Sequence, residues 1–133
     1  MYASRTSHQF YKTTKEKKLM EMSTLELLRD RVFKKLLPEA VDEALSSLGD
    51  SSKQAIYFCL EETFKIKRQS IPNKIEEFTN AIEKIFGRGA KVLEIQMMKY
   101  LYEKVGRDFE YFPEKDDLLF IEYVEAVYLH MNF

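Results

Sequence analysis

The fold class is decided by one stretch, IPNKIEEFTNAIEKIFGRGAKVLEIQMMKYLYEKVG, which covers residues 71–106. Both halves of it place apolar side chains three or four residues apart, the spacing of one helical face. Gly87 ends the first pattern and Gly106 the second, and glycine is the usual residue just after a helix. The sequence therefore predicts two helices joined by a tight turn, one starting near Pro72 and one covering about residues 90–105. The apolar positions are Ile75, Phe78, Ile82, Ile85 and Phe86, then Leu93, Met97 and Leu101.

The same spacing is found on the N-terminal side of this stretch. One apolar stripe covers residues 22–36, and another resumes after Pro38. We expect Pro38 to interrupt the first helix and open a new one, because proline suits the first turn of a helix and not its interior. Gly49 ends that piece, and Asp50 is expected to cap the next helix with its carboxylate. The apolar face of that next helix consists of Ile56, Cys59, Leu60 and Phe64.

The last helix is predicted to open near Pro113 and to continue almost to Phe133. Its side chains are apolar nearly all round, and such a helix must be buried on every side. It is therefore either the central helix of the fold, or it presents one face to another chain. The candidate interface consists of Leu118, Phe120, Ile121, Tyr123, Val124 and Tyr128.

Length and composition agree with one helical domain. The chain has 133 residues, 45% of them hydrophobic, and only four Gly and three Pro, which disfavours a β fold with many turns. We predict an all-α, compact bundle of about five to six helices with short loops over residues 23–133. Residues 1–22 are polar and are expected to form a flexible tail. The alternative is upstream sequence from a start site assigned too early, because Met20 and Met22 lie where the apolar pattern begins.

The location predicted from the sequence is cytoplasmic. Residues 1–22 lack the apolar run of a signal peptide. The most apolar window, residues 118–131, is shorter than a membrane span and contains charged residues. The single cysteine, Cys59, cannot form an internal disulfide, which is typical of a reducing compartment.

No residue pattern indicates catalysis or metal binding. His8 and His130 have no second ligand at the spacing that metal sites use. Cys59 lies on an apolar stripe, where a small buried hydrophobe is expected rather than a nucleophile. The segment GRGAK, residues 87–91, opens a helix but lacks the spacing of a phosphate-binding P-loop. We therefore predict no enzyme, no catalytic residue, no metal and no cofactor. A small-ligand carrier or enzyme that uses the apolar interior is the least favoured alternative.

Charge is balanced overall and segregated along the chain. The 21 Lys and Arg against 22 Asp and Glu give −1, yet residues 65–107 hold ten basic and five acidic residues. A helix–turn–helix around Gly87 makes DNA binding the main alternative function, because such motifs place their second helix in the major groove. That second helix offers few groups able to contact base edges. The candidate nucleic-acid contacts are Lys84, Arg88, Lys91 and Lys99.

Two strings in the chain carry a family resemblance: LGDSSKQAIYF at residues 48–58, and the stretch at residues 71–106 quoted above. They resemble the Nitrosopumilus-type output domain, the fifth of its series, a small all-helical domain of ammonia-oxidising archaea. With the last helix, the resemblance covers residues 38–133. It implies an effector role in signal transduction beside sensory components, and it supplies no catalytic residues. We recognise no receiver or sensor domain in this chain, which departs from a two-component pattern. We therefore expect a non-catalytic output domain that contacts a protein partner or a second copy of itself, without membrane association.

Overall fold

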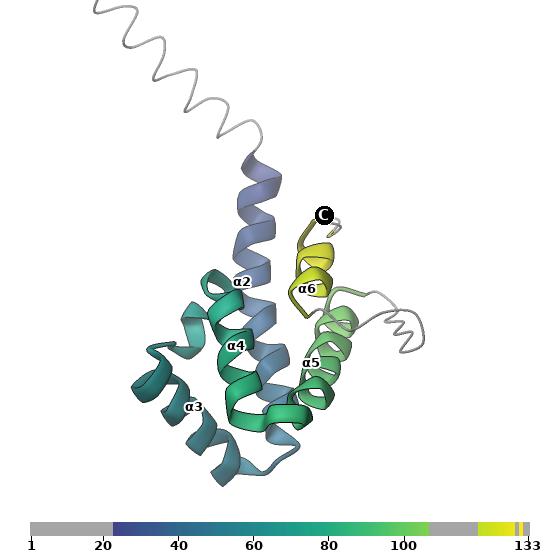
Figure 1. Ribbon diagram of the computed structural model, residues 1–133. Helices are drawn as coiled ribbons and strands as arrows, with labels where there is room; N and C mark the ends of the chain where they lie inside the picture. Colours follow the sequence, from purple (N-terminus) through teal and green to yellow (C-terminus); the bar gives the residue numbers. More distant parts are fainter. Residues whose placement is uncertain (1–22, 107–119, 130, 132–133) are drawn as a thin grey trace, which may run out of the picture.

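The computed structural model of the chain describes residues 23–106, 120–129 and 131, and within them it contains helices and no strand (Figure 1). The prediction of an all-α fold with short loops is confirmed. The α-helices are α2 (Ser23–Ser46), α3 (Asp50–Phe64), α4 (Ile75–Phe86), α5 (Ala90–Lys104) and α6 (Phe120–Leu129), and two 3₁₀ helices join them, η1 (Arg68–Asn73) and η2 (Gly87–Gly89). The predicted tail at residues 1–22, His8, Leu118 and His130 lie outside the described residues.

The long helix α2 packs along α5 and also contacts α3, η1 and α6. It continues through Pro38, so the prediction that Pro38 opens a new helix is wrong. Proline inside a helix costs about 3 kcal/mol. Leu37, Val41 and Leu45 on this helix are fully buried, and each such side chain contributes roughly 1.5–3 kcal/mol. Burial of the α2 face therefore outweighs the proline.

The turn between α2 and α3 corrects a second prediction. Gly49, not Asp50, occupies the capping position of α3, and it does so at φ 98°, a conformation that glycine adopts without steric penalty. Asp50 is the first helical residue. Its negative charge still lies at the positive end of the helix, where it is favourable.

The helices predicted over residues 71–106 are confirmed. α4 ends at Phe86, and Gly87 follows it at φ 56°. α5 begins at Ala90, as expected, and ends at Lys104, one residue before the predicted boundary. Both helices bury their predicted stripes, with Phe78, Ile82, Met97 and Leu101 inaccessible to solvent.

The last helix, α6, lies at one side of the molecule against α5, α4 and α2 (Figure 1). It buries Phe120, Val124 and Val127, whereas Leu129 is 62% exposed. Because one side of α6 is exposed, α6 is not the central helix of the fold. The other alternative, that one of its faces contacts another chain, stays a prediction. Among the described helices, none has the length and apolar character needed to cross a lipid bilayer.

A polar cluster joins α2 to α3 and η1. The Arg68 Nε donates to both carboxylate oxygens of Asp42 at 2.9 Å, and the Tyr57 hydroxyl also donates to Asp42. Burial by itself raises the pKa of Asp42, but the hydrogen bonds from Arg68 and Tyr57 and nearby positive charges outweigh it and hold the pKa below its ordinary value. The ionised form of Asp42 therefore stabilises the fold.

Replacing Asp42 with Ala is expected to lower the free energy of unfolding at pH 7 by about 1–2 kcal/mol, because it removes two charge-assisted contacts, one of them to a partly exposed arginine. The folded-state pKa of Asp42 is depressed, so its contribution is present above the unfolded-state pKa and is lost as the pH falls through the folded-state pKa. Urea unfolding at pH 7 and pH 3 measures this. The exposed Glu61→Ala on α3 is the control, and an equal loss in both variants would contradict the role of Asp42.

Candidate functional site

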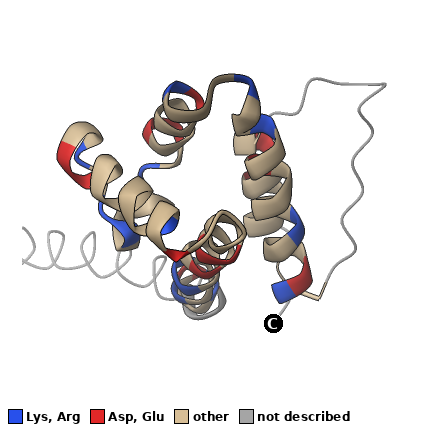
Figure 2. Ribbon diagram, turned by 90° about the horizontal axis from the view of Figure 1, so that it is seen from below, with Lys and Arg blue, Asp and Glu red and all other residues tan. Residues whose placement is uncertain are grey.

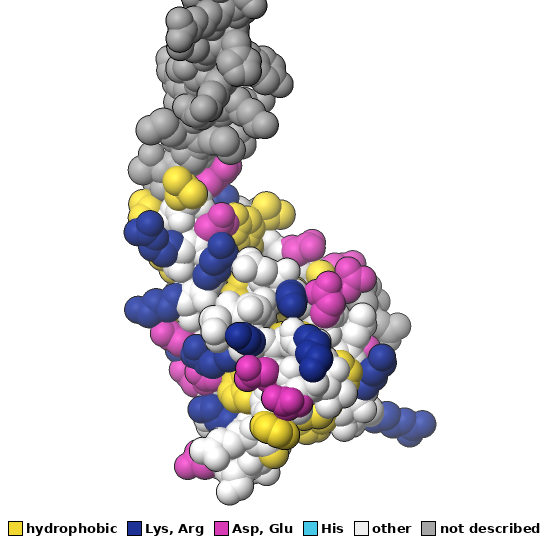
Figure 3. Space-filling view, turned by 90° about the vertical axis from the view of Figure 1, so that its left-hand side faces the viewer, with side chains coloured by type: hydrophobic (Ala, Val, Ile, Leu, Met, Phe, Trp, Pro, Cys, Tyr) yellow, Lys and Arg dark blue, Asp and Glu magenta, His cyan; other side chains and the backbone are white. Residues whose placement is uncertain are grey.

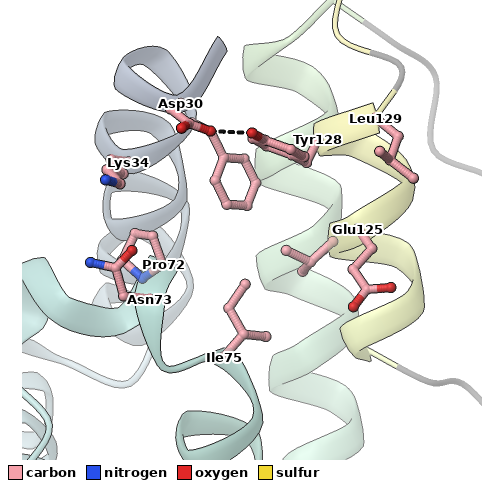
Figure 4. Close-up of a pocket in the computed structure, with 10 residues that line it drawn as sticks. Asp30, Lys34, Pro72, Asn73, Ile75, Glu125, Tyr128 and Leu129 are labelled. Atoms are coloured by element: carbon pink, nitrogen blue, oxygen red, sulfur yellow. Dashed lines mark hydrogen bonds between the residues drawn. The ribbon is translucent and has the colours of Figure 1, made fainter. Parts of the chain in front are cut away.

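A groove of about 480 Å³ lies between α2, the η1–α4 junction and α6 (Figure 4). Aromatic and aliphatic side chains line most of it, and polar groups stand at its sides. Lys34 and Asn73 lie on one side of the groove, and Glu125 lies on the other. The lining residues are Asp30, Phe33, Lys34, Pro72, Asn73, Ile75, Val124, Glu125, Tyr128 and Leu129.

Helical spacing explains which side chains reach the groove. Asp30, Phe33 and Lys34 are three and four residues apart, so they share one face of α2. Val124 and Tyr128 are four residues apart and share one face of α6. The groove is therefore a gap between two helical faces that come from opposite ends of the described chain.

Tyr128 fixes the two walls of the groove to each other. Its hydroxyl donates to the carboxylate of Asp30, 98 residues away in the sequence. Its ring packs edge-on against Phe33 with centroids 5.3 Å apart, and the Arg29 guanidinium carbon lies 5.9 Å from the ring centroid. The hydrogen bond to Asp30, then burial, raise the pKa of the Tyr128 hydroxyl above its ordinary value, so the hydroxyl keeps the proton that it donates to Asp30.

One exposed leucine lines the groove, and a second lies one helical turn before its α2 wall. Leu129 on α6 is 62% exposed, and Leu27, three residues before Asp30 on α2, is 60% exposed. Hydrophobic side chains are also visible at the N-terminal end of α2 in the space-filling view, which is seen from the side opposite α6 (Figure 3). Single exposed leucines are common, but an exposed leucine in the lining of an apolar groove adds to an apolar surface that is typical of an interaction site.

The six candidate interface residues fall into three groups. Leu118 lies outside the described residues. Phe120 and Val124 are buried in the chain's own core, where Phe120 packs near Phe78, and Val124 also lines the groove. Ile121, Tyr123 and Tyr128 are half-buried on α6, and Tyr128 forms a wall of the groove. Contact of this helix with another chain stays a prediction.

The four candidate nucleic-acid contacts are exposed. Lys84 lies on α4, Arg88 in η2, and Lys91 and Lys99 on α5. Acidic and basic residues alternate on these helices instead of forming one basic face (Figure 2). The structure brings Arg88 and Lys91 together in a second hollow, of about 520 Å³, but Lys84 and Lys99 do not line it.

The second hollow contains a residue that the sequence analysis missed. Glu94 of α5 is only 4% exposed, and its Oε1 has no hydrogen-bond partner among the described residues. Burial and the negative charge of Glu83 raise the pKa of Glu94 to about 7, against a smaller opposite effect of Lys91. A signal for this burial was present, because Glu94 is four residues after Ala90 and three before Met97, on the buried stripe of α5.

Cys59 is half-buried and not fully buried as predicted, with its Sγ 3.9 Å from the Thr63 hydroxyl. In the described part of the chain, no group of three or more His, Cys, Asp and Glu is arranged to hold a metal ion.

Comparisons with family models, with curated proteins and with solved structures found no match for this chain. The resemblance of residues 38–133 to the Nitrosopumilus-type output domain stays a prediction.

Proposed function

We propose that this chain is a non-catalytic helical interaction domain that binds an apolar segment of a protein partner in the groove between α2 and α6. The observation that carries the proposal is the apolar groove with the exposed Leu129 in its lining. An amphipathic helix is the partner segment that suits such a groove, because it presents anchors every three or four residues along one face. The resemblance noted above adds a role in archaeal signal transduction, in the cytoplasm.

The polar groups of the groove support binding rather than chemistry. Asp30 and Tyr128 are engaged with each other, so neither is presented to a substrate as a free acid or base. Lys34, Asn73 and Glu125 stand at the sides, where they can form hydrogen bonds with the polar face of a bound helix. DNA binding is less well supported, because acidic side chains lie between the basic residues of α4 and α5.

Replacing Leu129 with Asp is expected to weaken partner binding by roughly 30-fold without unfolding the chain. A charge in the lining of an apolar groove is left without compensation when the partner covers it, and the loss of such a contact costs about 2 kcal/mol of binding free energy. The tagged full chain is used to recover partners from native lysate, which are identified, purified and titrated against each variant.

Val92→Asp is the matched control, because Val92 is 59% exposed, lies on α5 and does not line the groove. The partner should bind the parent chain and Val92→Asp with equal affinity, and its affinity for Leu129→Asp should be much lower. Light scattering after size-exclusion chromatography shows whether the partner is a second copy. A partner that binds both variants as well as the parent chain, or a chain that captures nothing, would argue against this groove.

A further inference from the structure

The hollow at the turn between α4 and α5 is a second site, separate from the groove. It is lined by Glu83, Gly87, Arg88, Ala90, Lys91 and Glu94, and its volume of about 520 Å³ lies in the range of small-molecule sites. Glu94 is the unusual residue in it, because it is only 4% exposed and its Oε1 has no hydrogen-bond donor among the described residues. An uncompensated buried carboxylate is costly, and a donor from outside the chain would satisfy it.

The charges around the hollow define the donor's chemistry. Glu83 and Glu94 are acidic and favour an ammonium group. Arg88 and Lys91 are exposed cations in the lining, and the N-terminus of the 15-residue helix α5 adds a partial positive charge that favours an anion. Two acids and two cations side by side leave no net charge, which disfavours both a simple metal ion and a polyanion. A molecule with one positive and one negative group matches both the acidic and the basic residues of the hollow.

We propose that this hollow binds a small zwitterion, whose ammonium group donates to Glu94 and whose acidic group is held by Arg88 at the N-terminal end of α5. The acidic group is a carboxylate or a phosphate, as in amino acids or aminoalkyl phosphates. Glu94 must be ionised to accept the ammonium group, so binding of the ligand and loss of the Glu94 proton are coupled.

The test titrates the full chain with β-alanine and with phosphoethanolamine, and follows backbone amide shifts by NMR. Ethanolamine and inorganic phosphate are the half-ligands. Both zwitterions should bind saturably, and phosphoethanolamine should bind at least tenfold more tightly than either of its halves. β-Alanine keeps both of its own charges between pH 6 and pH 8, so its affinity reports on the protein. With the pKa of Glu94 at about 7, the ionised fraction rises about tenfold over this range, and the affinity should rise about tenfold with it.

Two variants and a control separate the roles of the residues. Glu94→Gln should bind β-alanine at least tenfold more weakly and should lose the pH dependence. Arg88→Ala should weaken both zwitterions and leave ethanolamine unchanged. Lys84→Ala removes a charge of the same sign nearby, outside the hollow, and should bind like the parent chain.

Three results would overturn the proposal. The first is no saturable binding of either zwitterion at millimolar concentrations. The second is equal binding by Glu94→Gln and the parent chain. The third is inorganic phosphate binding as tightly as phosphoethanolamine, which would indicate an anion site without a role for Glu94. Because Arg88 is exposed, loss of binding in Arg88→Ala cannot be attributed to unfolding, which amide spectra of each variant check directly.

Discussion

Replacing Phe78 with Ala is expected to lower the free energy of unfolding by about 3–5 kcal/mol, the range for a large aromatic side chain removed from a packed core. Phe78 on α4 is fully buried, and its ring lies 6.4 Å, centroid to centroid, from that of Phe120 on α6. The cavity left by Ala would therefore weaken the attachment of α6 as well as the core around α4. Chemical denaturation followed by circular dichroism measures the change, and amide exchange in α6 should accelerate more than exchange in α3.

Phe58→Ala is a closely matched control, because it makes the same chemical change at a phenylalanine that is 69% exposed on α3. Its expected effect is below about 1 kcal/mol, since most of the ring stays in water in the folded chain. The comparison isolates burial from residue type. Equal losses of stability in the two variants would show that the described core is wrong.

Replacing Glu94 with Gln is expected to stabilise the chain by about 3 kcal/mol at pH 8. The pKa of Glu94 is raised from 4.5 to about 7, and each pKa unit corresponds to about 1.4 kcal/mol. For an acid whose folded-state pKa is raised, the chain loses stability as the pH rises from the unfolded-state value through the folded-state value. The difference between variant and parent should therefore vanish near pH 4.5, grow between pH 4.5 and pH 7, and level off above that range.

Urea unfolding at intervals from pH 4.5 to pH 8 measures this difference. Glu61→Gln makes the same change at an exposed position on α3 and should stay within about 0.5 kcal/mol of the parent at every pH. A parent chain whose stability does not decline between pH 5 and pH 8 relative to Glu94→Gln would show that Glu94 ionises freely. That result would also remove the reason for placing a ligand against it.

The two helices of residues 71–106 and their C-terminal ends could be predicted closely, because a strong helical period and glycines after each helix act locally and agree with each other. The start of α4 could not, since Pro72 lies in η1 and α4 begins at Ile75. Pro38 could not be interpreted correctly from the sequence. Its local preference is to open a helix, and only the burial of α2 against α5 and η1 shows that the chain gains more by continuing. The cap of α3 was predicted one residue too late, at Asp50 instead of Gly49, because both residues are suited to helix starts.

The candidate groove could be predicted only in part. The apolar character of the last helix left two alternatives, a central position or a face that contacts another chain, and Tyr128 was among the candidate interface residues and lines the groove. The residues of the other wall, such as Asp30, Phe33 and Ile75, belong to segments whose pairing with α6 depends on the tertiary fold, and no local spacing encodes it. Glu94 was within reach of sequence reasoning, because an acidic residue on an otherwise apolar stripe is a local observation.

The hydrogen bond between Asp30 and Tyr128 also has a consequence for the newly made chain. A ribosome adds about 5–20 residues per second, so Asp30 is made about 5–20 s before Tyr128, which lies 98 residues later. During that interval Phe33 has no α6 to cover it, whereas α2 can already pack on α5 as soon as residues 90–104 emerge. The wall formed by α6 is thus completed after the contact between α2 and α5, and until then the side of Phe33 that Tyr128 covers in the folded chain stays open.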